Sequence, residues 1–370
     1  MSRPLRVLML SKACIVGIYQ RKLELIARHN IDLLTLVPPS WRDERGEMRL
    51  ERAYTDGYRL AVVPIQRNGS FHLHTFGEVG AHIRQFQPDV VHIDEEPYNV
   101  AAWQALYHAR RAGAKTLFFS WQNIQRRYPP PFSTGERWVL RAVDHAIAGT
   151  ESAAAVWRAK GYRGPMTVIP QFGADPDLFT PSAARPERPF TIGFVGRLVA
   201  EKGVHVLLGA LARLPDPDWR LEVYSDGPQR AALAAQAEGL GIIERVRFCG
   251  QRPSSDMPAI FHRFDALALP SLTRPNWKEQ FGRVLVEAMA SGVPVIGSDS
   301  GAIPDVIGAA GLVTPEGDVP ALADALARLQ GDASLRARLG QAGRARVLER
   351  FTHAQVAADT VAVYRAMVGN

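Results

Sequence analysis

Short, continuous apolar segments alternate with longer amphipathic segments along almost the whole chain. An unbroken apolar run is typical of a parallel strand that helices cover on both faces, because neither face meets water. In the first half we expect such strands over Leu5–Leu10, Ile31–Val37, Tyr58–Ile65, Asp89–Ile93, Lys115–Ser120, His145–Ala148 and Met166–Ile169. In the second half we expect them over Phe190–Val195, Arg220–Tyr224, Val246–Cys249, Ala266–Leu269, Val293–Ile296 and Gly311–Val313.

The segments between these strands carry helical periodicity. From Val204 to Leu214, apolar residues recur as they do along one face of a helix, and Pro215 ends the run. Strand followed by helix, repeated in two blocks, predicts an α/β protein with two Rossmann-like sheets.

A proline-rich stretch separates the two blocks. Residues 175–189 carry four prolines and little apolar periodicity, which is the composition of a linker. A chain of 370 residues also exceeds the size at which a single core keeps growing. We therefore expect one domain over residues 1–175 and a second that begins at residue 176.

Composition narrows the class of protein. An apolar fraction of 46% and a charged fraction of 22% are those of a soluble globular protein. No apolar run approaches the roughly 20 residues that a membrane-spanning helix needs, and the start of the chain lacks a signal-peptide pattern. Cys14 and Cys249 lie too far apart for a disulfide framework or a metal motif. These features favour a cytoplasmic location.

The net charge of +7 comes from the first half, where residues 1–175 hold 23 Lys and Arg against 16 Asp and Glu. Nucleic acid, an anionic membrane surface, an anionic acceptor or a plain solvated surface would each explain it. No nucleic-acid-binding motif is present, so we expect no such partner. The segment 38–49 combines Trp41 with several cations. It fits either a solvated loop or a peripheral contact with a lipid surface or an anionic glycan.

The first chemical motif follows the strand that ends near Val195. Gly196 permits close approach to the backbone, and Arg197 and Lys202 add two cations just before a predicted helix. Because the amino end of a helix offers free N–H groups, this combination predicts a site for a diphosphate.

A second motif places two carboxylates at the start of a later helix. Glu279 lies in the preceding loop, whereas Glu287 lies two turns inside the helix, and the N–H groups around Gly282 face the same ligand. Such carboxylates accept hydrogen bonds from sugar and ribose hydroxyls. Asp226, in the turn Ser225–Pro228 after another strand, is placed to border a nucleotide base.

In order and spacing these motifs resemble the donor-binding domain of the family 4 retaining glycosyltransferases, which have the two-domain GT-B fold. The resemblance extends from residue 196 to residue 305. Its matching positions are Gly196-Arg197-Leu198, Glu201-Lys202-Gly203, Asp226-Gly227-Pro228, Glu279, Glu287 with the run to Val295, and Gly301–Asp305.

The resemblance implies roles for these residues. Arg197 and Lys202 would hold the donor diphosphate, Glu279 would contact the transferred sugar, and Glu287 would contact the ribose. The backbone at Phe281 and Gly282 would complete the sugar pocket. No metal or other cofactor would be needed, because cations and helix N-termini replace a divalent ion.

The resemblance also implies a domain plan. An acceptor-binding domain would cover residues 1–175 and a sugar-nucleotide-binding domain would cover 176–350. A last helix within 351–370 would cross back to the first domain.

The first half departs from the family pattern. Only one glycine, Gly17, is available for the backbone contact with the diphosphate after the first strand. A histidine usual in the family after a mid-domain strand is missing, and that place holds Gln122 and Asn123. The segment His92–Glu96 supplies other candidates for acceptor or sugar contacts, namely His92, Glu95 and Glu96.

We therefore expect a metal-independent, retaining glycosyltransferase of the hexosyltransferase type. It would act on a hydroxyl acceptor in polysaccharide or glycolipid assembly, or in natural-product tailoring. Two alternatives stay open, a sugar-nucleotide 2-epimerase-like isomerase and a non-catalytic sugar-nucleotide-binding partner. A peripheral position at the inner membrane face is also open.

Overall fold

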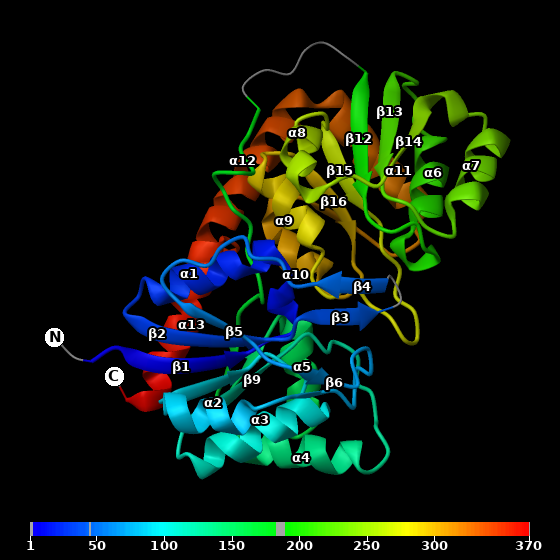
Figure 1. Ribbon diagram of the computed structural model, residues 1–370. Coiled ribbons are helices and arrows are strands. Elements are labelled where there is room, and N and C mark those ends of the chain that lie inside the picture. Colours follow the sequence, from blue (N-terminus) through cyan, green and yellow to red (C-terminus); the bar gives the residue numbers. More distant parts are fainter. Residues whose placement is uncertain (1–2, 44–45, 183–188, 370) are drawn as a thin grey trace. The chain divides into compact units, whose positions relative to one another are not determined.

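The computed structural model describes residues 3–43, 46–182 and 189–369, which form two compact α/β units (Figure 1). Unit 1 comprises Met1–Gly173 together with His353–Asn370, and unit 2 comprises Ala174–Thr352. The last helix, α13 (His353–Val368), is therefore part of unit 1. Residues 183–188, in the middle of the expected linker, lie outside the described residues, as do residues 44–45.

In its described part, unit 1 is built on a seven-stranded parallel sheet of order β11-β10-β9-β8-β1-β2-β5. Its strands are β1 (Leu5–Leu10), β2 (Ile31–Val37), β5 (Arg59–Val62), β8 (Val90–Ile93), β9 (Lys115–Ser120), β10 (His145–Ala148) and β11 (Met166–Val168). The central strands are buried on both faces, as their apolar runs require.

Helices cover both faces of this sheet. On one face α1 (Arg21–Ala27) packs against α13, and both contribute to one apolar core. A second core holds the apolar residues of the helices on the other face. These are α2 (Val79–Phe86), α3 (Val100–Arg111), α4 (Phe132–Ala142) and α5 (Glu151–Ala159).

Unit 2 is built, over its described residues, on a six-stranded parallel sheet of order β14-β13-β12-β15-β16-β17. The strands are β12 (Phe190–Val195), β13 (Trp219–Tyr224), β14 (Val246–Gly250), β15 (Ala266–Leu269), β16 (Val295–Ser298) and β17 (Leu312–Thr314). The helices are α6 (Val204–Leu211), α7 (Arg230–Gly239), α8 (Met257–Phe261), α9 (Arg283–Ala290), α10 (Ile303–Ile307), α11 (Val319–Gly331) and α12 (Ala333–Arg350).

The sequence patterns predicted the paired strands of both sheets closely, but they missed two short hairpins. One hairpin joins β3 (Ser40–Asp43) to β4 (Gly46–Arg49), and the other joins β6 (Ile65–Gln66) to β7 (Thr75–Phe76). The first hairpin takes the place of the expected loop: Arg42, Glu47 and Arg49 are exposed, whereas Trp41 is only 7% exposed. Its ring packs edge-on against His74, with 5.0 Å between ring centroids.

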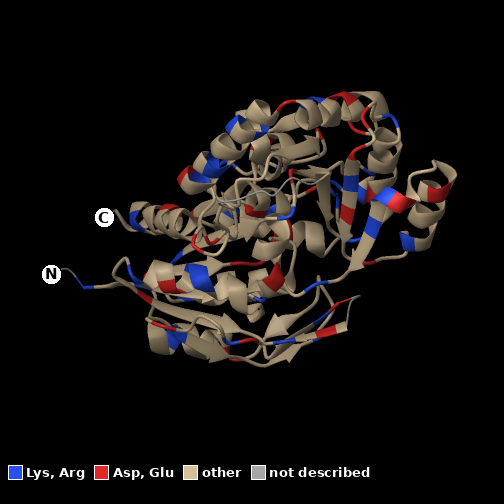
Figure 2. Cartoon of the chain, turned by 90° about the horizontal axis from the view of Figure 1, so that it is seen from above, with Lys and Arg blue, Asp and Glu red and all other residues tan. Residues whose placement is uncertain are grey.

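Charged residues of both signs are interspersed over many elements, as Figure 2 shows. Within the described residues, no helix combines the length and the apolar character that crossing a membrane requires.

Candidate active site

The first motif of unit 2 lies where β12 and β13 end. The Gly196 amide donates to the Tyr224 carbonyl at 3.2 Å, and the Leu198 amide donates to the Asp226 carbonyl at 3.1 Å. These bonds join the loops that follow the two strands, so the sequence-predicted residues Gly196, Arg197 and Asp226 come together at one edge of the sheet. This is the edge at which open α/β sheets bind ligands.

The structure also brings together Lys202 and Glu279, which lie far apart in the sequence. The Lys202 ammonium donates to Glu279 Oε2 at 2.6 Å, and the Ser271 hydroxyl donates to the same oxygen at 2.9 Å. The Trp277 ring centroid lies 5.1 Å from the ammonium. Glu279 is 7% exposed, so a single buried carboxylate is fixed by two donors.

Two glycines allow the loops of this site to approach each other. A Cβ at Gly203, where φ is 68°, would lie 1.8 Å from the Pro270 carbonyl oxygen. A Cβ at Gly301, where φ is 57°, would lie 2.1 Å from the Glu279 carbonyl oxygen. Only glycine fits these positions, which place Lys202 and Glu279 beside each other.

Helix α9 begins directly after Gly282, which has a φ of 73° and no side chain to cap the helix. The Phe281 ring is buried and packs against Phe351 at 5.8 Å between centroids, which anchors the loop in front of the helix. The positive end of the helix dipole therefore lies next to Glu279 in the sequence and near the Lys202 ammonium.

Glu287 lies in α9, but one turn from its start instead of the expected two. Its Oε1 lies 3.1 Å from Arg283 Nε. Burial raises the pKa of the Glu287 carboxyl, and Arg283 partly opposes this effect. A carboxyl in this state readily accepts a hydrogen bond from a ligand hydroxyl.

The Asp226 side chain interacts with neighbouring residues of its own turn. Its Oδ1 accepts the Gly227 amide at 2.8 Å, and its other oxygen lies 3.7 Å from Arg230. The side chain is exposed. A contact with a nucleotide base stays a prediction.

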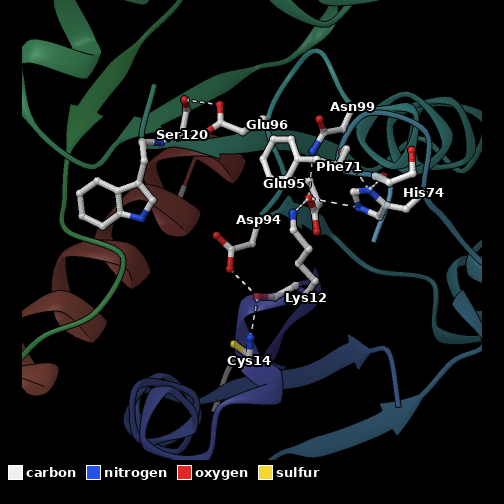
Figure 3. A network of polar contacts seen from close by, with 12 residues as sticks. Lys12, Cys14, Phe71, His74, Asp94, Glu95, Glu96, Asn99 and Ser120 are labelled. Carbon is white, nitrogen blue, oxygen red and sulfur yellow. Dashed lines mark hydrogen bonds and ion pairs between the residues drawn. The ribbon is translucent and has the colours of Figure 1, made fainter. Parts of the chain in front are cut away.

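In unit 1, polar side chains gather at the carboxyl ends of β1 and β8 (Figure 3). Glu95 follows β8 and pairs with Lys12, which follows β1. His74 Nε2 lies 3.4 Å from the same carboxylate oxygen, and the Asn99 amide donates to it at 3.2 Å. Burial alone would raise the pKa of Glu95, but Lys12 and His74 outweigh burial and lower the pKa to about 2.

Glu96, the next residue, faces the end of β9. The Ser120 hydroxyl donates to Glu96 Oε2 at 2.5 Å, and the Trp121 amide donates to Oε1 at 3.0 Å. Burial raises the pKa of Glu96 to about 7, although both donors oppose the shift. A carboxyl with a pKa near neutrality at a strand end is typical of functional sites.

Gln122 and Asn123 are buried beside this group. The Gln122 amide donates to the Ile124 carbonyl at 3.0 Å, and Lys160 approaches its oxygen at 3.5 Å. Gln122 therefore fixes the loop after β9. Contacts of Gln122 and Asn123 with a sugar stay predictions.

His92 and Gly17 are two further residues that the sequence suggested for the site. His92 points from β8 into the core, where Nδ1 hydrogen-bonds the Tyr364 hydroxyl at 2.6 Å, and burial lowers its pKa well below the usual range. The Gly17 amide already donates to Glu51 Oε2 at 2.6 Å. His92 is thus a core residue, because β8 alternates its side chains between faces, and the backbone contact of Gly17 with a diphosphate stays a prediction.

Sequence reasoning missed His74 and Asn99 as members of the Glu95 group. His74 comes from the hairpin segment before α2, and Asn99 comes from the turn before α3. Neither stands in a motif, since only the fold brings them to Glu95.

In the part of the chain that the structure describes, no group of three or more His, Cys, Asp or Glu residues is arranged to hold a metal ion. The expectation that the site works without metal stays a prediction.

Two family profiles match overlapping parts of the chain. Glycosyltransferase Family 4 matches residues 18–192, and Glycosyl transferases group 1 matches residues 177–346. Together they extend from residue 18 to residue 346 and include residues of both units.

The curated relatives have several different names and activities. A D-inositol 3-phosphate glycosyltransferase from Corynebacterium glutamicum is 34% identical over 54% of this chain and 51% of its own. A 2-deoxystreptamine glucosyltransferase from Streptomyces kanamyceticus is 32% identical over 66% of each chain. A glycogen synthase from Mycobacterium tuberculosis is 31% identical over 76% of this chain and 70% of its own. The chain thus spans about half the length of the first of these relatives.

Solved structures share the fold over nearly the whole chain. Sucrose-phosphate synthase from Thermosynechococcus elongatus has a TM-score of 0.75 and 21% identity, and each chain is covered to 99%. HepE from Anabaena, in complex with UDP and glucose, has a TM-score of 0.70 and 20% identity over 98% of this chain and 100% of that one. This likeness identifies the GT-B fold.

Proposed function

The chain belongs to glycosyltransferase family 4, and from this premise we propose that it transfers a sugar from a nucleoside diphosphate sugar to a hydroxyl acceptor. The observation that carries the proposal is the Lys202–Glu279 pair at the carboxyl edge of the unit 2 sheet. A sugar that bears a diphosphate needs a cation for the phosphates and a carboxylate for the ring hydroxyls, and this pair supplies both side by side.

The catalytic residues in this proposal are Arg197, Lys202 and Glu279. As the glycosidic bond of the donor breaks, negative charge grows on the leaving diphosphate. Arg197, Lys202 and the N–H groups at the start of α9 would stabilise that charge, which is commonly the largest catalytic contribution. Glu279 would hold the transferred sugar, with Phe281 and Gly282 lining the pocket and Gly196 passing close to the phosphates.

We further propose that transfer retains the anomeric configuration and requires no metal. In a front-face reaction the leaving phosphate itself takes the acceptor proton, so a dedicated base is optional. Two cations and a helix N-terminus supply the positive charge that a divalent ion would otherwise bring. Adding a chelator to a transfer assay, and determining the product anomer by NMR, tests both statements.

For the nucleotide of the sugar donor, uridine nucleotides should be tested first. HepE, which shares the fold, was solved with UDP and glucose, and that likeness supports the order of testing. Glu287 would receive the ribose and Asp226 would border the base.

The epimerase-like and non-catalytic alternatives are not favoured by the relatives, which carry glycosyl transfer activities. For the pathway we propose polysaccharide or glycolipid assembly, or natural-product tailoring. A cytoplasmic location, with a peripheral membrane contact through the basic first half, belongs to the same proposal.

The direct test is a thermal-shift screen of the purified chain against UDP, GDP, ADP and dTDP without added metal. A ligand at 100 times its dissociation constant stabilises a two-state fold by about 2.7 kcal/mol. We expect one nucleotide to raise the melting temperature, and Glu287→Ala and Lys202→Ala to abolish the response. Four nucleotides without effect, and no hydrolysis of the matching sugar nucleotides, would contradict the proposal.

A further inference from the structure

One face of the unit 2 sheet has little cover near its edge strand β14. On β12 this face is covered by the Phe264 ring, which an added Cβ at Gly193 would approach to 2.2 Å. Glu222, the Cα partner of Gly193 on β13, is still buried, with 7% exposure. Arg247, the Cα partner of Glu222 on β14, is exposed. The cover of this face therefore ends between β13 and β14.

Two arginines lie together on the open part of this face. Side chains alternate between faces along a strand, so Arg220, two residues before Glu222, lies on the same face as Glu222 and Arg247. Strand spacing and rise place the Cα atoms of Arg220 and Arg247 about 8 Å apart. Both side chains are exposed, and neither forms an ion pair with another residue that the structure describes.

The carboxylate beside these two arginines already has its own partner. Arg263 donates to both oxygens of Glu222, from Nε at 2.8 Å and from a terminal nitrogen, and the Tyr224 hydroxyl donates at 2.8 Å. Burial alone would raise the pKa of the Glu222 carboxyl, but these donors and the charge of Arg247 lower it. Since Arg263 balances the charge of Glu222, the charges of Arg220 and Arg247 are left without compensation.

This part of the sheet borders a cavity of about 670 Å³. Pockets that bind small molecules commonly have volumes of about 300–1,000 Å³. The charged residues that line the cavity are four arginines and two glutamates, namely Arg220, Arg245, Arg247, Arg263, Glu222 and Glu244. The lining therefore has an excess of two positive charges, and the cavity favours an anion.

The cavity lies toward the amino ends of the strands, opposite to the candidate active site. Arg220 and Arg247 are the second residues of β13 and β14, whereas Gly196 and Asp226 follow the carboxyl ends of β12 and β13. About 13 Å of strand separates Arg220 from Tyr224, the last residue of β13. A ligand in the cavity would therefore leave the diphosphate site free.

We propose that this cavity is a second anion-binding site and that its ligand is a phosphate monoester of a soluble metabolite. Such an ester carries about −1.5 to −2 charges at pH 7, which matches the excess charge of the lining. The planar guanidinium groups of Arg220 and Arg247 fit phosphate oxygens with paired hydrogen bonds. The ligand can bind together with a nucleotide, and the inference does not depend on the proposed glycosyl transfer.

The test is isothermal titration calorimetry on the full chain, with glucose 6-phosphate and inorganic phosphate as probes and glucose as the uncharged counterpart. The variants are Arg220→Gln, Arg247→Gln and the double variant, and the control is Arg213→Gln, another exposed arginine of unit 2. Lys202→Ala separates this cavity from the diphosphate site. Vesicles of phosphatidylcholine with and without phosphatidic acid test a lipid phosphate instead of a soluble one.

We expect glucose 6-phosphate to bind wild type, Arg213→Gln and Lys202→Ala with the same affinity, and glucose to show no such binding. Loss of one charged hydrogen-bonding group should weaken binding by about tenfold or more in each single variant, and further in the double variant. Because the substituted arginines are exposed, we expect the melting temperatures without ligand to match wild type.

An unchanged affinity in the double variant, or loss of binding in Lys202→Ala, would place the phosphate elsewhere and overturn the inference. The same would follow if wild type bound neither probe at millimolar concentrations, or bound glucose as well as glucose 6-phosphate. Arginine-dependent binding to the phosphatidic acid vesicles alone would reject a soluble ligand. Each of these results leaves the nucleotide screen, and with it the proposed function, unaffected.

Discussion

Lys202 is held on two sides, by the Glu279 carboxylate and by the face of the Trp277 ring. Its ammonium therefore keeps one position before any ligand arrives. Such preorganised charge costs no rearrangement when the leaving group develops its own charge.

Replacing Lys202 with alanine should lower kcat by roughly 100-fold or more, by the measure of other preorganised charge stabilisers. The Glu279 carboxylate would also lose this cation while it keeps the hydrogen bond from Ser271. Steady-state transfer assays test this, with Arg213→Ala, an exposed cation after α6, as the control. A folded Lys202→Ala variant with normal turnover would remove the residue from the catalytic group.

Glu96 makes the stability of the chain depend on pH. Its folded-state pKa of about 7 lies above the ordinary value of 4.5, so folding favours the protonated carboxyl. This contribution is complete below pH 4.5 and is lost as the pH rises through about 7. The stability of Glu96→Gln relative to wild type should therefore increase between pH 5 and pH 8, by on the order of 1–3 kcal/mol.

Melting temperatures of both proteins across this pH range measure the effect. The comparison concerns how the difference changes with pH, because the amide also alters the hydrogen bonds from Ser120 and Trp121. A difference that is constant from pH 5 to pH 8 would show that Glu96 does not titrate in this range.

Some site residues could be predicted from the sequence and others could not. Lys202, Glu279 and Glu287 stand next to strand ends and a helix start, where local pattern and chemistry coincide. His74 and Glu95 are far apart in the sequence, and only the folded chain brings them into contact. Whether His92 lies at the site or in the core depends on the face of β8 to which its side chain points, and the sequence does not show that face. The burial of Trp41 was missed because its neighbours in the sequence are charged.

Close approaches between backbone segments position the elements that carry the site residues. Gly203 ends the turn that contains Lys202 and starts α6, and Pro270 follows β15. The Leu272 amide donates to the Glu201 carbonyl at 2.7 Å, which ties the same two segments together. The position of Lys202 therefore depends on the absence of a side chain at Gly203.

A Gly203→Ala variant should lose several kcal/mol of stability, because its Cβ would lie 1.8 Å from the Pro270 carbonyl oxygen. Gly241 is a matched control, since it has the same φ of 68° and an added Cβ there would meet no atom within 4 Å. Gly241→Ala should cost only the backbone strain, about 1–2 kcal/mol.

Thermal melting with and without the identified nucleotide measures both variants. We expect Gly203→Ala to lose the nucleotide response as well, while Gly241→Ala keeps it. Equal destabilisation of the two variants would mean that the close contact with the Pro270 carbonyl oxygen is not what requires glycine at position 203.

At the level of elements, continuous apolar runs predicted the parallel strands because burial on both faces leaves a clear pattern. Short hairpins such as β3–β4 leave no such pattern, since one hydrogen-bonded pair of short strands needs few apolar residues. The helix at Val204 was predicted to extend to Leu214, whereas α6 ends at Leu211.

The whole molecule contains one unit that is continuous in the sequence and one that is not. Unit 1 depends on α13, whose Val356, Val361 and Tyr364 are almost fully buried in its core. The family profiles, in contrast, end at residue 346 and do not include this helix.

Expressed alone, residues 174–352 should fold and keep the nucleotide response. A chain that ends at residue 352 should lose the cooperative melting of unit 1, because the apolar core on the α1 face would be open to water. Circular dichroism and calorimetry distinguish these outcomes. A truncated chain that melts like the full one would show that α13 is dispensable.

The chain enters and leaves unit 2 at one place, since the Ala174 amide donates to the Phe351 carbonyl at 2.8 Å and Ala174 forms a parallel bridge with Thr352. Unit 2 is thus an insertion between two parts of unit 1. Residues 174–352 are therefore synthesised before α13, whereas unit 1 gains this helix only after residue 352. Loss of α13 would thus leave every residue of unit 2 in place and damage the unit that is translated first.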